Sequence, residues 1–405
     1  MLIAGEASGD LLAAELATAL RAKVLDVESE PTDDVQPLRT PLAPRFFGAG
    51  GPRMAAAGVE LAFDMTQHSV IGLSDALKHY LKFRRLFRQL FRLAVERQPD
   101  AIICVDFSGF NRRFAHAIRQ YVRPRLDWFH PWNPKLIQYV SPQVWASRPG
   151  RAHQLAEDYD LLLSIFPFEK EWYARCTRKL RVEFVGHPLM SRFTTDGFRF
   201  TREGAESASL PNRESQILLL PGSRVDELRR HWPVMLGALR LIRAKLPQCR
   251  ARMVLPTETL AEQAKSLGVP AEVQIQVGGL PEALAQADLA IAKSGTVTLE
   301  CAYFGVPTVV LYKTSWPTYY TARAMVNVKH VAMPNLLANK EVFPEFLQGA
   351  ATPENVARAA LELLCDETRR QTVKARLAKV VASLGGPGAN QRAADAIMNL
   401  LLPAI

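Results

Sequence analysis

The chain has 405 residues, 48% hydrophobic and 22% charged, a composition that excludes a disordered protein and a length that suits two domains with separate cores. Its formal net charge of +10 favours a polyanionic partner: nucleic acid, phosphorylated small molecules or an anionic membrane face. Five scattered cysteines without CxxC spacing indicate neither a disulfide framework nor a zinc site, and the lack of a leader-like or membrane-length apolar segment predicts a cytoplasmic protein.

Apolar strand-like runs alternate with helical patterns along the chain, and this alternation predicts parallel sheets built from βαβ units. The fold class that we expect is α/β, with two Rossmann-like doubly wound domains that face each other across a cleft. The predicted strands are 2–4, 101–105, 136–140, 161–165 and 182–185 in the first series, and 217–220, 251–255, 273–277, 289–292 and 308–312 in the second. The predicted domains are 1–187 and 215–380, with a polar linker at 188–214 and, at 381–405, a C-terminal helix for which the N-terminal domain is a candidate partner.

The first predicted strand is followed by a glycine-bearing turn at 5–10. This turn does not match the GxGxxG fingerprint, so we predict no dinucleotide cofactor. It suits a close approach to a sugar or its phosphate, with Glu6 and Ser8 as polar contacts and Gly9 in the turn. The alternative for Ser8 is that it only caps the following helix.

A basic and aromatic stretch runs from Lys78 to Arg92 and contains no acidic residue. Its large apolar residues are too numerous for a purely solvated helix. Part of this stretch is therefore expected either to be buried or to meet lipid.

Asp106 closes a predicted strand, and an acid at that place beside a cleft is suited to act as a general base. Capping of the next turn, or a bond to Asn111, is an equally good interpretation. Gln143 and Trp145 follow the next strand and are candidates for a polar and aromatic wall against a sugar, with a core role as the alternative for Trp145. His187 is a candidate cleft residue, although a satisfied structural histidine is the commoner outcome.

Ser223 and Arg224 end the first strand of the second series. The planar guanidinium of Arg224 suits a diphosphate because it can bind two oxygens at once, and a surface pair with Glu227 is the alternative. A diphosphate held in this way needs no metal, and we find no acidic pair placed to hold one.

A second phosphate site is predicted where the strand 289–292 ends and a helix begins, at Ser294, Gly295 and Thr296. Unpaired backbone N–H groups and the positive end of the helix dipole converge there. Glu300 lies about one turn later, where its carboxylate can accept hydrogen bonds from the hydroxyls of a ribose. An ordinary capped helix with a surface glutamate is the alternative.

These motifs, in this order, resemble those of the lipid-A-disaccharide synthase family, inverting glycosyltransferases with the glycosyltransferase-B fold. The resemblance covers nearly the whole chain. It departs at Ser147, where the family often has Trp, and at Gly109, where many members have a second acid. The matching segments are 5–10, 50–54, 106–111, 139–146, 166–169, 185–188, 220–224, 294–300 and 334–337.

The resemblance implies a reaction between UDP-2,3-diacylglucosamine and 2,3-diacylglucosamine 1-phosphate that releases UDP and forms the β-1,6-linked disaccharide of lipid A, without cofactor or metal. It implies that Asp106 is the base for the acceptor hydroxyl, with Glu6 and Ser8 beside the reacting sugars. It assigns to the UDP side Arg224, Ser294, Gly295, Thr296, Glu300 and Asn335, together with Glu345 and Gln348 near the donor.

The resemblance also implies a membrane-facing patch within 70–83, with ordinary core packing as the alternative. The chain is then expected on the cytoplasmic face of the inner membrane as a peripheral protein, without a nucleic-acid partner, and a homodimer is left open. The rival functions are a UDP-sugar epimerase or another UDP-sugar transferase of the same fold, and a non-catalytic lipid- or sugar-nucleotide-binding protein. The patch residues are Leu73, Leu77, Tyr80 and Phe83 toward the acyl region, and Lys78, Lys82 and Arg84 toward anionic headgroups.

Overall fold

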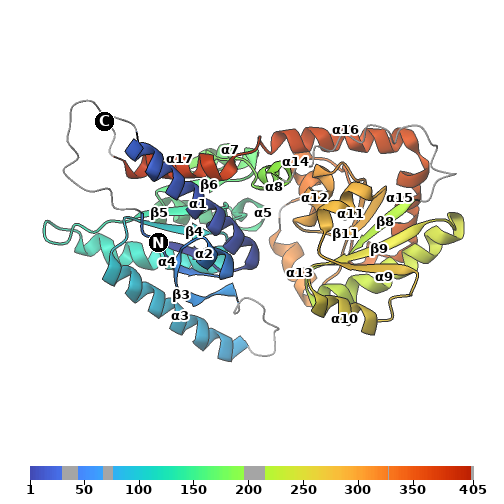
Figure 1. Ribbon diagram of the computed structural model, residues 1–405, viewed down its shortest axis with the longest axis horizontal. Helices are drawn as coiled ribbons and strands as arrows, with labels where there is room; N and C mark the ends of the chain where they lie inside the picture. Colours follow the sequence, from blue (N-terminus) through green and yellow to red (C-terminus); the bar gives the residue numbers. More distant parts are fainter. Residues whose placement is uncertain (30–43, 67–75, 196–214, 327, 403–405) are drawn as a thin grey trace. The chain divides into compact units, whose positions relative to one another are not determined.

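The structure is a computed structural model that describes residues 1–29, 44–66, 76–195, 215–326 and 328–402. The chain separates into two compact units (Figure 1). The first unit is Met1–Ser191 with Gly385–Ile405, and the second is Arg192–Leu384. The boundaries therefore lie four residues beyond the predicted 187 and 380, and residues 189–195 of the predicted linker form a helix.

The first unit contains a seven-stranded parallel sheet with the order β3-β2-β1-β4-β5-β6-β7. The chain runs outward from β1 to β3 and then returns to the other side of β1, so the strand order reverses between β1 and β4. The strands are β1 (Leu2–Ala4), β2 (Phe47–Gly50), β3 (Glu60–Asp64), β4 (Ala101–Val105), β5 (Lys135–Tyr139), β6 (Leu161–Ser164) and β7 (Arg181–Phe184).

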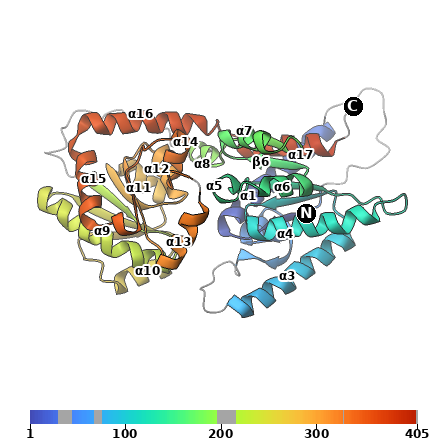
Figure 2. The same cartoon turned by 180° about the vertical axis from the view of Figure 1, so that it is seen from behind.

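Helices cover both faces of this sheet, which is why its central strands are continuous apolar runs. On one face α3 and α4 lie side by side (Figure 2). Phe87 and Phe114 are in edge-to-face contact between them. The helices are α1 (Ala7–Ser29), α2 (Pro52–Ala56), α3 (Ala76–Arg97), α4 (Ser108–Val122), α5 (Val144–Ser147), α6 (Arg151–Asp158), α7 (Pro167–Cys176) and α17 (Ala389–Leu401), with a 3-10 turn at Arg123–Arg125. Helix α8 (Leu189–Thr195) contains the boundary between the two units.

The C-terminal helix α17 packs against α1 within the first unit. Asn390 accepts a hydrogen bond from the Tyr139 hydroxyl at 2.7 Å and donates to the Glu15 carboxylate at 2.9 Å. An ion pair between Lys23 and Asp395 at 2.8 Å extends the same contact. These bonds attach the end of the chain to the sheet that its beginning forms.

The second unit contains a six-stranded parallel sheet with the order β10-β9-β8-β11-β12-β13. Here the strand order reverses between β8 and β11. The strands are β8 (Gln216–Leu220), β9 (Arg250–Leu255), β10 (Val273–Val277), β11 (Leu289–Lys293), β12 (Thr308–Tyr312) and β13 (Glu345–Leu347). The helices are α9 (Val225–Lys245), α10 (Glu258–Ser266), α11 (Leu280–Gln286), α12 (Val297–Tyr303), α13 (Trp316–Met325), α14 (Met333–Ala338), α15 (Pro353–Cys365) and α16 (Glu367–Ser383), with a 3-10 turn at Gln348–Ala350.

Candidate functional site

In the first unit, the predicted catalytic residues lie at the carboxyl ends of β1 and β4. These two strands are paired in parallel, with Ala4 opposite Val105, so the turn after β1 and Asp106 after β4 are neighbours. In open α/β sheets, ligands bind outside the carboxyl ends of the strands where the strand order reverses. The sheet therefore brings the predicted base to the position where a substrate is expected.

Asp106 has a left-handed backbone, with φ of +50°, which is uncommon outside glycine. Its N–H donates to the Tyr139 carbonyl at 2.9 Å, and its carbonyl accepts from the Asn111 amide at 2.8 Å and from the Gln138 amide at 3.2 Å. These bonds hold the strained conformation in place. Asn111 thus contacts the backbone of Asp106 through its amide, and no side chain caps α4.

Burial raises the pKa of the Asp106 carboxyl, the negative charge of Glu6 raises it further, and the Phe107 N–H opposes both. The two carboxylates are therefore close enough to interact. A carboxylate that binds a proton more tightly than usual is a stronger base at the moment of proton transfer. This environment suits Asp106 to general-base chemistry.

The first turn of α1 packs closely on the end of β4. A Cβ atom at Gly9 would lie 3.7 Å from the Cβ atom of Asp106, and one at Gly5 would overlap the Phe107 ring at 2.3 Å. Ser8 is exposed and lies inside α1, which begins at Ala7, so the capping interpretation of Ser8 does not fit. Its hydroxyl is available to a substrate.

Asp10, the last residue of the turn motif, is a supporting residue that we did not predict. It is buried and accepts backbone hydrogen bonds from Gly51, Arg53 and Met54 at 2.7, 3.0 and 3.1 Å. Its carboxylate thereby holds the loop between β2 and α2. The only sequence signal of this contact was that the segments 5–10 and 50–54 both contain glycines.

Trp145 and Gln143 follow β5, the neighbour of β4. Trp145 is half-buried, and its indole N–H donates to the Glu169 carboxylate at 2.9 Å, while its ring meets Phe168 edge to face. Gln143 is exposed. The buried Glu169 therefore holds the Trp145 ring in place. Because Trp145 is only half-buried, it is neither a full core residue nor a fully exposed wall of the site.

Glu169 itself is fully buried, and burial raises its pKa to about 7 against the opposing hydrogen bonds from Ser164 and Trp145. His187 is also buried, and its Nδ1 accepts from the Leu189 N–H at 3.1 Å. This bond fits the structural interpretation of His187, because it ties the ring to the start of α8.

In the second unit, a cavity of about 310 Å³ opens at the carboxyl ends of β8, β9 and β11. It contains three of the predicted nucleotide-site residues: Ser223, Thr296 and Glu300. It is also where the strand order of this sheet reverses. The lining residues are Leu220, Gly222, Ser223, Val254, Leu255, Pro256, Gly278, Leu280, Lys293, Thr296, Val297 and Glu300.

A glutamate and a lysine are paired at the mouth of this cavity. Glu227 accepts from Lys293 at 3.1 Å and from the Ser223 N–H at 2.9 Å. Burial disfavours the charged form of Glu227, but Lys293 and the Ser223 N–H outweigh it and lower its pKa. Gly222 has φ of +131°, and a Cβ atom there would lie 2.3 Å from the Glu227 carboxylate. Only glycine fits this loop.

Arg224 is exposed at the N-cap position of α9, where its guanidinium can reach a ligand. The alternative for Arg224 was a surface pair with Glu227, and Glu227 is held by Lys293 instead. Lys293 was not among our candidates, although it stands directly before the predicted phosphate turn. The position of Lys293 at the end of a buried strand was the sequence signal that could have identified it.

Thr296 is exposed at the N-cap position of α12 and makes no capping bond with its own side chain. The Ser294 hydroxyl donates to the Val331 carbonyl at 2.9 Å, so it anchors this turn to the loop before α14. Burial raises the pKa of Glu300, with Arg192 opposing it. A half-buried carboxyl that lines a cavity suits hydrogen bonds from ligand hydroxyls better than a surface role.

Three residues that the resemblance assigns to the UDP side form hydrogen bonds inside the protein. Asn335 is fully buried, donates to the Phe343 carbonyl and to Glu345, and accepts from the backbone of 342–343. Glu345 accepts from the backbone N–H groups of 331–332. Gln348 is buried and forms two hydrogen bonds with the backbone of Thr314. They hold the loops around the site and are not in the cavity lining.

His231 is a further supporting residue that the sequence did not indicate. It is fully buried, donates from Nδ1 to the Pro221 carbonyl at 2.7 Å, and accepts on Nε2 from the Lys313 N–H at 3.0 Å. Burial lowers its pKa, which favours the neutral ring that these two bonds require. His231 thereby joins the loop after β8 to the loop after β12.

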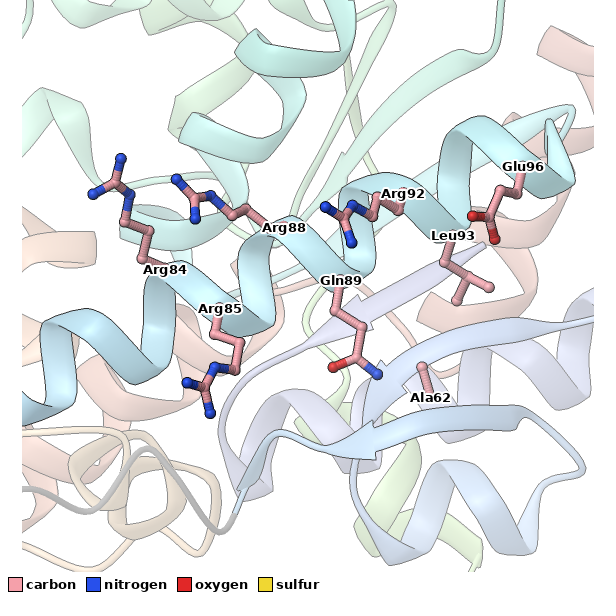
Figure 3. Close-up of a pocket in the computed structure, with 8 residues that line it drawn as sticks. All are labelled: Ala62, Arg84, Arg85, Arg88, Gln89, Arg92, Leu93 and Glu96. Atoms are coloured by element: carbon pink, nitrogen blue, oxygen red, sulfur yellow. The ribbon is translucent and has the colours of Figure 1, made fainter.

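Most of the predicted membrane patch lies outside the described residues or side chains: Leu73, Leu77, Lys78, Tyr80 and Lys82. Phe83 is half-buried and packs toward Phe107, with ring centroids 6.5 Å apart, which corrects its assignment to a lipid-facing position. Arg84 is exposed. It begins a row with Arg85, Arg88 and Arg92 that lines an open groove between α3 and β3 (Figure 3).

Known proteins that are similar to this chain place it in one family. The family model described as lipid-A-disaccharide synthetase matches residues 1–398. The lipid-A-disaccharide synthase of Anaeromyxobacter dehalogenans (strain 2CP-C) is 36% identical and that of Myxococcus xanthus (strain DK1622) 35% identical, over 99% and 100% of this chain and 97% of each relative.

Among solved structures, the glycotransferase of kitacinnamycin is similar in fold, with a TM-score of 0.57 and 19% identity over 99% of this chain and 98% of that one. The predicted α/β class and glycosyltransferase-B fold are confirmed by the two parallel sheets and by this similarity. The chain belongs to the lipid-A-disaccharide synthase family.

Proposed function

We propose that the chain transfers 2,3-diacylglucosamine from UDP to the 6-hydroxyl group of 2,3-diacylglucosamine 1-phosphate. The family supports this reaction. The observation that supports the proposal in this chain is Asp106, a carboxyl with a raised pKa and a constrained backbone that lies where the strand order of the first sheet reverses.

In the proposed mechanism, the Asp106 carboxylate takes the proton of the acceptor hydroxyl as its oxygen attacks the anomeric carbon of the donor. The new C–O bond forms opposite the bond to the diphosphate, which breaks as UDP departs. In-line attack inverts the configuration at that carbon and gives the β-linkage. Glu6 keeps Asp106 basic through its charge, and Ser8 is placed to orient a sugar hydroxyl.

The cavity of the second unit is the proposed site for UDP. Lys293 and the backbone around Gly222 and Thr296 line the cavity and suit the diphosphate, and Glu300 is suited to the ribose hydroxyls. Arg224 is exposed at the start of α9, where we propose that it also binds the diphosphate. Within the described ranges, no group of three or more His, Cys, Asp or Glu side chains is arranged to hold a metal ion. We propose that basic side chains neutralise the diphosphate, which predicts full turnover in excess EDTA.

The arginine row on α3 supports a proposed anionic membrane surface as a partner. Arg84 and Arg92 are two helical turns apart, about 12 Å, and no acid among the described residues forms an ion pair with any arginine of the row. Basic clusters of this kind attract anionic headgroups with about 1 kcal/mol per residue. No described helix is both long and apolar enough to cross a bilayer.

Vesicle flotation tests this partner. Arg88→Gln with Arg92→Gln is expected to weaken binding to phosphatidylglycerol vesicles about 10- to 30-fold, because roughly 2 kcal/mol of attraction is removed. The matched control is Arg229→Gln with Arg230→Gln, which removes the same charge from the exposed side of α9. Equal losses of vesicle binding in both variants would mean that only the net charge of the protein matters, which would contradict a specific role of the α3 arginines.

The reaction is tested by incubating the protein with UDP-2,3-diacylglucosamine and 2,3-diacylglucosamine 1-phosphate and measuring product masses. Disaccharide 1-phosphate and UDP are expected, whereas isomerisation of the donor sugar alone would indicate an epimerase. Asp106→Asn is expected to lower turnover by a factor of about 100 to 10,000 while UDP affinity is kept. Near-normal turnover in this variant would move the role of base to another residue.

A further inference from the structure

Helix α13 (Trp316–Met325) is an apolar helix without a buried residue. Trp316 is 55% exposed and Tyr320 62% exposed, and their rings are stacked with centroids 5.7 Å apart. Tyr319 packs edge-on against both rings. An aromatic cluster of this size on the surface of one unit calls for a ligand or partner to cover it.

Helix α13 follows β12, at the carboxyl end of the sheet that carries the proposed UDP site. Strand β12 pairs with β11 in register, with Leu311 opposite Lys293, and the Ser294 N–H donates to the Leu311 carbonyl at 3.1 Å. Trp316 follows Leu311 by five residues, at most about 18 Å of extended chain, and neighbouring strands are about 5 Å apart. The aromatic cluster therefore begins within about 23 Å of the cavity residue Lys293.

The base of α13 is fixed firmly to the nucleotide loops. Thr314 forms two hydrogen bonds with Gln348, and the Lys313 N–H donates to His231, whose other nitrogen donates to the Pro221 carbonyl. Ser315 then caps the helix through the Thr318 N–H. These bonds position an exposed apolar surface beside the site with little freedom at its base.

The chemistry of the helix favours a lipid over a polar ligand. Its single charged residue is Arg323, which donates to the Tyr319 hydroxyl at 3.0 Å, and it contains no acid. Tryptophan and tyrosine offer an apolar ring with a polar edge, which suits the region where an acyl chain joins a sugar headgroup.

We infer that the face of α13 formed by Trp316, Tyr319 and Tyr320 binds an acyl chain of the sugar-nucleotide donor. This inference rests on the proposed function, since the donor is the ligand that enters the adjacent cavity with its acyl chains attached. The helix then contributes to donor selection by chain length, while the cavity binds the nucleotide.

The test compares two donors, UDP-2,3-diacylglucosamine with decanoyl chains and with acetyl chains, on wild type and on the double variant Trp316→Ser, Tyr320→Ser. Loss of the aromatic surface is expected to weaken binding of the decanoyl donor and to lower its kcat/KM by about 10- to 100-fold. Affinity for the acetyl donor and for UDP is expected to stay within about twofold, because neither reaches the aromatic face.

Trp128→Ser is the matched control, because Trp128 is 92% exposed on the first unit and far from this helix in sequence. It is expected to leave binding of both donors unchanged. Equal losses for both donors and UDP in the double variant, together with a lower melting temperature, would mean that α13 is covered by protein. No loss for either donor would also overturn the inference.

Donor binding and turnover are measured separately, so that a failure of the proposed reaction can be distinguished from a failure of the proposed acyl-chain site on α13. If wild-type protein binds the donors but forms no disaccharide, the proposed reaction fails while the chain-length comparison of donor affinities still decides the role of α13.

Discussion

The buried carboxyl of Glu169 predicts a pH-dependent stability that a single substitution should remove. Its pKa is raised from 4.5 to about 7 by burial, which favours the protonated form in the folded protein. A group with a raised pKa stabilises the fold below its unfolded pKa and loses that contribution as the pH rises through its folded value. Wild-type stability is therefore expected to fall between about pH 4.5 and pH 7.

The magnitude follows from the two pKa values. A difference of about 2.5 units corresponds to roughly 3 kcal/mol, at 1.36 kcal/mol per unit. Glu169→Gln keeps the shape of the side chain and remains neutral at every pH. Its carbonyl can accept from Trp145, and its amide can donate to the Ser164 hydroxyl that now lies 2.6 Å from the carboxylate. The variant should therefore equal wild type near pH 5 and exceed it by up to about 3 kcal/mol near pH 8.

Urea unfolding of both proteins at pH 5 and pH 8, followed by tryptophan fluorescence, measures this difference, and all other titrating groups cancel in the comparison. Glu171→Gln is the control, because Glu171 is on the same helix but 79% exposed, and its pH profile should run parallel to that of wild type. A Glu169→Gln profile parallel to wild type would refute the reasoning, since it would mean that Glu169 has the same pKa in both states.

Three further outcomes are expected. Gly222→Ala should weaken UDP binding at least about tenfold by calorimetry and cost about 1–3 kcal/mol of stability, because the positive φ and the Glu227 carboxylate leave no room for a methyl group; unchanged affinity would separate this loop from the UDP site. Asp10→Asn should lower the free energy of unfolding by about 2–4 kcal/mol, because an amide group would face a backbone N–H that now donates to the carboxylate; an unchanged melting temperature would contradict this. Lys293→Met should weaken UDP binding about tenfold or more, whereas Lys293→Arg should retain most of it; equal losses would argue that the residue acts through packing.

Much of the fold could be predicted from the sequence, because buried parallel strands are continuous apolar runs. The strands around Ile103 and Ile291 were identified in this way. Strands β2, β3 and β13 were not, because Phe47–Gly50 is half glycine, Glu60–Asp64 begins and ends with an acid, and Glu345–Leu347 has only three residues. In these three strands, of which β3 and β13 are at the edges of their sheets, pairing with a neighbouring strand decides the structure and the local sequence does not.

The places of the candidate residues in the fold were predictable where these residues follow the end of a strand. Asp106, Ser223 and Thr296 are such residues, and the parallel topology places each at the carboxyl edge of its sheet. Asp10 and His231 were missed because each acts through partners that are distant in sequence, whereas Lys293 was missed although it ends a buried strand. Spacing along the chain gives no information about such contacts.

Asn335, Glu345 and Gln348 show that the polar side chains of a recognised motif can form their hydrogen bonds inside the protein. Their side chains are the polar kind that a sugar nucleotide would bind, but a buried amide or carboxylate must satisfy its own hydrogen bonds first, and here the loops of the protein satisfy them. Replacement of Asn335 by Ala would leave a buried carbonyl and two backbone N–H groups unpaired. Its effect on UDP affinity should therefore come with a loss of stability, and this combination distinguishes a supporting residue from one that touches the ligand.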